Sequence, residues 1–66
     1  MNNYHFSLSQ DTNLVGEGYG FGANALEAFE QAVNNGSVIL PINEPVTVIA
    51  INDFGLGFKF EANKTF

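Results

Sequence analysis

The sequence predicts an α+β fold in which an antiparallel sheet of four to five strands carries a single helix packed on one face. Two observations lead to this prediction: one segment has helical periodicity, and several short segments alternate apolar with polar or glycine residues. The expected order is strand, strand, helix, short strand, strand, strand. We expect residues 1–66 to form a single domain.

The helix is predicted over residues 24–36. Asn24 is a suitable N-cap, and Glu27 stands three residues later, at the spacing of a capping box. Asn35 and Gly36 mark the end, because both residue types tolerate the left-handed conformation that terminates helices. So short a helix is marginal alone and needs a partner surface. The apolar face that we expect to pack on the sheet consists of Ala25, Leu26, Ala28, Phe29, Ala32 and Val33.

Two strands are predicted before the helix. Residues 4–9 alternate, with Tyr4, Phe6 and Leu8 on one side, which is the pattern of a half-buried strand. Residues 10–13 are polar and suit a turn, and a second strand is predicted over residues 14–21. The two strands are expected to pair as a hairpin.

Glycine occupies every second position of the second strand, from Gly16 to Gly22, so one face of that strand is bare backbone. One interpretation is structural: the helix or a bulky neighbouring side chain lies against this face. The other is functional: the face is a shallow exposed groove for a partner's side chains. A nucleotide-binding loop is not indicated, because Phe21 stands where the dinucleotide fingerprint requires glycine and the phosphate-loop lysine is missing.

Three strands are predicted after the helix. Residues 38–40 are expected to form a short strand that lies at an edge or ends at Pro41, which lacks a backbone N–H. Residues 46–51 are β-branched on both faces and predict a central strand. A turn at Asn52 and Asp53 leads to a last strand over residues 54–61. Its even positions form an apolar stripe that we expect in the core: Phe54, Leu56, Phe58 and Phe60.

Composition and charge narrow the function. The chain has no cysteine, which excludes disulfides and thiolate metal sites. Seven acidic residues face two lysines and no arginine, for a net charge of −5. Such a surface repels nucleic acid and membranes, and it suits either solubility alone or a basic protein partner. No apolar run is long enough to span a membrane and no signal segment is recognised, so we expect a cytoplasmic protein.

No catalytic or metal-binding constellation is recognised. His5 is the only histidine; it shares a strand face with Ser7, but nothing indicates the acid and the oxyanion hole that a triad requires. We therefore expect His5 to be a solvent-facing strand residue. One histidine and scattered carboxylates do not provide a metal ligand set. We expect no enzymatic activity, no cofactor and no metal.

Three classes of function remain. The first is an inhibitor that presents carboxylates to a basic, nucleic-acid-binding protein surface, where they compete for the Arg and Lys that hold phosphates. The second is a module that self-associates through a sheet edge or the glycine-lined face. The third is a small-ligand binder that uses an aromatic cleft between helix and sheet. The carboxylates proposed for partner binding are Glu17, Glu27, Glu30, Glu44, Asp53 and Glu61.

The whole chain resembles the small phage-encoded anti-CRISPR inhibitor proteins in size, charge and architecture. The resemblance is carried by the helix over residues 24–36, the acidic surplus and the Phe-alternating strand from Phe54 to Phe60. It implies a monomer in the host cytoplasm that stops a DNA-recognising CRISPR subunit from engaging target DNA, by charge mimicry or by steric occlusion with a mixed polar and aromatic patch. A weaker resemblance, to small antitoxin-like domains that neutralise a toxin by binding it, remains the alternative.

Overall fold

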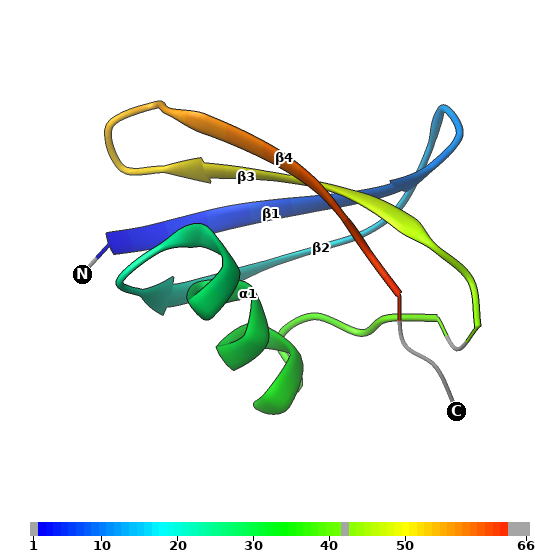
Figure 1. The fold of residues 1–66 in the computed structure, drawn as a ribbon, viewed down its shortest axis with the longest axis horizontal. Helices are drawn as coiled ribbons and strands as arrows, with labels where there is room; N and C mark the ends of the chain where they lie inside the picture. Colours follow the sequence, from blue (N-terminus) through cyan, green and yellow to red (C-terminus); the bar gives the residue numbers. More distant parts are fainter. Residues whose placement is uncertain (1, 42, 64–66) are drawn as a thin grey trace.

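A computed structural model describes residues 2–41 and 43–63 and contains four strands and one helix (Figure 1). The elements are β1 (Asn2–Gln10), β2 (Asn13–Gly22), α1 (Ala25–Asn34), β3 (Val46–Asn52) and β4 (Gly57–Ala62). The strands form one antiparallel sheet in the order β2-β1-β3-β4. The predicted α+β class, with a single helix on a sheet of four to five strands, is confirmed.

The predicted hairpin of the first two strands is confirmed. β1 pairs with β2 from Asn2 opposite Gly22 to Gln10 opposite Asn13, with a register shift after Leu8. Asp11 stands in the turn between the two strands with φ of 56°, a left-handed conformation that Asp tolerates better than most residues do. The pairing places Gly20, Gly18 and Gly16 of β2 opposite Tyr4, Phe6 and Leu8 of β1.

The helix is formed, and Asn24 is its N-cap as predicted. The Oδ1 of Asn24 accepts a hydrogen bond from the backbone N–H of Glu27 at 2.9 Å, and Gly36 follows the helix with φ of 83°. Of the expected apolar face, Ala25, Ala28, Phe29 and Ala32 are buried. Leu26 is an exception: it is 59% exposed, because it lies at the side of the helix that faces away from β2 and towards the open region beside β4.

The bare glycine face of β2 lies against α1, which confirms the structural interpretation. A Cβ at Gly20 would collide with the carbonyl oxygen of Ala28, and one at Gly22 would stand 2.7 Å from the Ala28 backbone nitrogen. A Cβ at Gly18 would overlap the backbone of Ser37 and the side chain of Val38. The glycines thus let the helix approach the strand at backbone distance. Gly16 is different, since nothing lies within 4 Å of its Cβ position.

β3 occupies the interior of the sheet, as predicted. It pairs with β1 on one side and β4 on the other. Val46, Val48 and Ala50 are buried on the helix side, whereas Ile49 and Ile51 on the opposite side are about two-fifths exposed. The core lies between the helix and the sheet, and its buried residues are Tyr4, Phe6, Leu8, Ala25, Ala28, Phe29, Ala32, Val38, Val46, Val48 and Ala50.

The prediction that the stripe from Phe54 to Phe60 is core was wrong for three of its four members. Phe54, Leu56 and Phe58 are 79%, 59% and 43% exposed, and only Phe60 is partly buried against the core. The physical reason is that α1 packs mainly on β2 and does not cover β4. The last strand also begins at Gly57, later than predicted, because the Oδ1 of Asn52 accepts hydrogen bonds from the backbone N–H groups of Phe54 and Leu56 and holds both in the turn.

The predicted short strand over residues 38–40 is not formed. The backbone N–H of Val38 donates to the carbonyl oxygen of Ala32 at 3.1 Å, so this segment is tied to the end of the helix and not to a sheet edge. The Val38 side chain is buried over Gly18. Val38 is therefore a core residue that comes from an irregular segment, whereas its neighbour Ile39 is 84% exposed.

Candidate functional site

An open cleft lies at the end of the sheet where the β1–β2 turn, the start of β3 and the end of β4 meet. Antiparallel pairing brings these three segments together although they are far apart in the sequence. The cleft has a volume of about 420 Å³. Its lining residues are Ser9, Gln10, Asp11, Glu44, Pro45, Val46, Thr47 and Glu61.

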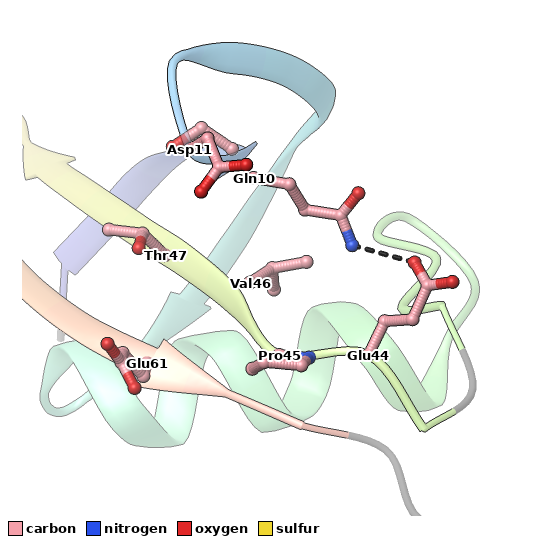
Figure 2. Close-up of a pocket in the computed structure, with 8 residues that line it drawn as sticks. Gln10, Asp11, Glu44, Pro45, Val46, Thr47 and Glu61 are labelled. Atoms are coloured by element: carbon pink, nitrogen blue, oxygen red, sulfur yellow. Dashed lines mark hydrogen bonds between the residues drawn. The ribbon is translucent and has the colours of Figure 1, made fainter.

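Three exposed carboxylates, those of Asp11, Glu44 and Glu61, surround this cleft. The Nε2 of Gln10 donates a hydrogen bond to the Oε2 of Glu44 at 2.8 Å, which joins the β1–β2 turn to the segment before β3 (Figure 2). The lining contains no lysine or arginine. We call this the acidic cleft, since its carboxylates are available to an approaching cation.

The six carboxylates proposed from the sequence do not form one site. Glu44 and Glu61 share the acidic cleft, and Glu30 lines a groove between α1 and β4. Glu27, in the first turn of α1, and Asp53, in the β3–β4 turn, belong to segments at the opposite end of the sheet (Figure 1). The sixth, Glu17, lies beside His5 on the sheet face that has no helix.

Asp11 belongs to the cleft but was not among the proposed carboxylates. Sequence reasoning placed it correctly in the first turn, yet its neighbours in space come from β3 and β4. Finding it required the strand order, because only the pairing of β1 with β3 brings the first turn next to Glu44. No pattern among neighbouring residues in the sequence predicts that β1 pairs with β3.

The sheet face without a helix combines polar and apolar side chains. His5 lies there, as predicted, with its Nε2 3.6 Å from the Oε2 of Glu17, an ion pair whenever the imidazole is protonated. Its ring packs beside that of Tyr19, with the centroids 4.9 Å apart. Tyr19 is 70% exposed, and the register places Ile51 opposite His5 on the same face. This face holds a single described lysine, Lys59, opposite Ile49.

An apolar groove follows the boundary between α1 and β4. It comprises two hollows of about 350 and 510 Å³ that share Leu26 and Phe60. Phe60 meets Phe29 edge to face with the ring centroids 5.3 Å apart, and Phe58 meets Tyr4 at 6.3 Å. This groove matches the aromatic cleft between helix and sheet that was considered for a small-ligand binder, but it is open along the side of β4.

No protein-family model, curated protein sequence or solved structure matches this chain. Among residues 2–41 and 43–63, no group of three or more acidic or histidine side chains is placed to hold a metal ion. In the same residues, no helix has both the length and the apolar character needed to cross a membrane.

Proposed function

We propose that this protein is an acidic inhibitor that binds a basic surface of a nucleic-acid-binding protein complex and thereby blocks engagement of DNA. The observation that carries this proposal is the acidic cleft, which Asp11, Glu44 and Glu61 line with no lysine or arginine beside them. Carboxylates grouped in this way suit the forked guanidinium groups with which proteins hold phosphates. A CRISPR surveillance complex is the target that the resemblance in size, charge and architecture favours.

Two properties of the molecule support contact through charge and shape, without chemistry on the partner. The net charge of −5 gives long-range attraction to a basic surface and raises the rate of encounter. Exposed apolar side chains, such as Leu14 and Tyr19 on β2, add contact area once the partner is reached. The net charge is modest for a complete mimic of duplex DNA, so steric occlusion of the DNA path is part of the proposal.

The test is a binding measurement between the purified protein and a purified type I CRISPR surveillance complex, at low and at high salt. The cleft variant carries Asp11→Asn and Glu44→Gln, which remove two charges and preserve side-chain shape. The matched control carries Glu27→Gln and Asp53→Asn, which remove two charges at the other end of the sheet. Circular dichroism checks that both variants are folded.

The proposal predicts capture of the complex, loss of its target-DNA binding and weaker capture at high salt. The cleft variant should bind roughly tenfold or more weakly than the control, since hydrogen bonds between carboxylates and arginine are worth about 1.5–3 kcal/mol each. Equal weakening of both variants would show that only the overall charge matters and would reject the cleft as the contact. Absence of capture at low salt would reject this target.

A further inference from the structure

β4 is the most exposed strand of the sheet. None of its residues is fully buried, whereas β1 buries Tyr4, Phe6 and Leu8. Within the described residues no strand pairs with the outer edge of β4, so that edge presents backbone N–H and C=O groups to another chain. β4 pairs with β3 in an uninterrupted register from Gly57 to Ala62, which leaves this edge regular.

The other edge of the sheet, β2, is less suited to pairing. Its register with β1 shifts after Leu8, an irregularity of the kind that twists an edge strand away from further partners. In addition, the backbone N–H of Phe21 donates to the Oε1 of Gln31 at 3.1 Å, so the helix already uses part of this strand. The two edges therefore differ, and β4 is the regular one.

We propose that two copies of this chain pair antiparallel through β4, about a two-fold axis at Phe60, to form a continuous sheet of both copies' strands. In this register Lys59 of each copy lies directly opposite Glu61 of the other, on the sheet face without helices. Opposite charges in directly opposed cross-strand positions stabilise antiparallel pairs. The same two residues thus supply two intermolecular charge pairs, as an isologous interface requires.

Neighbouring registers are disfavoured by the same two charges. One neighbouring register places Lys59 of one copy opposite Lys59 of the other, and the neighbouring register on the other side places Glu61 opposite Glu61. Like charges in directly opposed positions are destabilising. The registers between these place an odd-numbered residue of one copy opposite an even-numbered residue of the other. They would put the two helices on opposite faces of the sheet, because side chains alternate with a period of two. Only the register centred on Phe60 matches the charges and keeps both helices on one face.

The helix side of β4 shows what the pairing would bury. There Phe60 lies opposite Phe60 of the second copy, and Phe58 lies opposite Ala62, a large side chain beside a small one. Phe58 is 43% exposed and Phe60 is only partly covered by Phe29. The open apolar groove along β4 would meet its symmetry mate at the centre of the new sheet. Pairing would thereby bury Phe58 and Phe60, the aromatic side chains of β4 that α1 leaves exposed or only partly covers.

The proposal replaces the expectation of a monomer. Its test is separate from that of the acidic inhibitor function because it needs the protein alone, although Glu61 belongs both to the acidic cleft and to the β4 pairing. A net charge of −5 on each copy opposes association, so we expect a weak dimer that forms at high protein concentration and is favoured by salt. The measurement is sedimentation equilibrium over a concentration series, starting from a monomer mass of 7.2 kDa. The expected result is a concentration-dependent mass that approaches twice this value.

Charge reversal at β4 separates the register from general electrostatics. Glu61→Lys makes the net charge less negative, which by itself should strengthen association, but it places a second lysine opposite Lys59 and should weaken the dimer roughly tenfold or more. Glu17→Lys on β2 changes the net charge by the same amount away from β4 and should leave the dimer unchanged or slightly stronger. The double variant Lys59→Glu/Glu61→Lys restores opposite charges across the pair and should restore the dimer.

Each result of these measurements supports or rejects the dimer through β4. A protein that stays monomeric at millimolar concentration and high salt overturns it. A dimer that is equally insensitive to Glu61→Lys and to Glu17→Lys associates through another surface and also overturns it. Amide hydrogen exchange provides a second readout: residues of β4 should gain protection as the protein concentration rises, and residues of β2 should not. Unchanged β4 protection in a confirmed dimer would reject the β4 interface.

Discussion

β1 and β4 carry similar alternations of large apolar side chains on the same side of the sheet, yet only β1 is covered. Tyr4, Phe6 and Leu8 of β1 are at most 3% exposed, whereas Phe58 of β4 is 43% exposed. The difference comes from β2, whose glycines let α1 pack at backbone distance over the β1–β2 half of the sheet. Alternation thus shows which side chains share a face, but the position of the helix decides whether that face is buried.

The largest difference in the free energy of unfolding is expected between substitutions of two phenylalanines, one on β1 and one on β4. Phe6→Ala empties a fully buried position and should lower the free energy of unfolding by about 4 kcal/mol. Phe58→Ala removes a half-exposed ring and should cost about 1 kcal/mol. Urea unfolding followed by far-ultraviolet circular dichroism measures both. Equal losses would mean that β4 belongs to the core as much as β1 does.

A smaller difference in the free energy of unfolding is expected between alanine substitutions of packed and unpacked glycines. Gly20→Ala introduces a methyl group against the backbone of Ala28, which cannot move without shifting the helix, and should cost about 3 kcal/mol. Gly16→Ala, on the same strand, and Gly57→Ala, on β4, meet open space and should change stability by less than about 0.5 kcal/mol. The same unfolding measurement applies. A tolerated alanine at position 20 would contradict the close packing of α1 on β2.

The smallest losses of stability are expected from substitution of two asparagines, one that caps α1 and one in the β3–β4 turn. Asn24→Ala removes the helix cap and should cost about 1 kcal/mol. Asn52→Ala removes the acceptor for the backbone N–H groups of Phe54 and Leu56 and should cost a similar amount, about 1 kcal/mol. Amide exchange distinguishes them: the first change should speed exchange in α1, and the second should speed exchange in the β3–β4 turn. Faster exchange in α1 from the Asn52 change would indicate that the two halves unfold together.

The local structure followed from the sequence because its signals are local. Asn24 indicated the start of the helix, Gly36 its end, and the alternation of Tyr4, Phe6 and Leu8 the inner face of β1. The close approach of another element to the glycines of β2 was one of the two interpretations that the sequence allowed, because a strand without side chains on one face leaves space that a folded chain fills.

The candidate site could not be predicted in the same way. Of the carboxylates at the acidic cleft, Glu44 and Glu61 were among the six proposed from the sequence, but it was not foreseen that they line one cleft with Asp11. Whether these side chains bind a partner stays a prediction. Their grouping depends on contacts between residues far apart in the chain, such as the hydrogen bond from Gln10 to Glu44.

Composition, periodicity and capping residues were sufficient for the hairpin, the helix and the overall class, since these depend on dihedral preferences and on neighbours a few residues away. The strand order, the exposure of the β4 stripe and the shared cleft of Asp11, Glu44 and Glu61 were decided by the tertiary structure. One short helix covers only part of a four-stranded sheet. Which part it covers is settled by the fit of the Ala28 backbone into the glycine face of β2, a packing contact between elements that no local pattern contains.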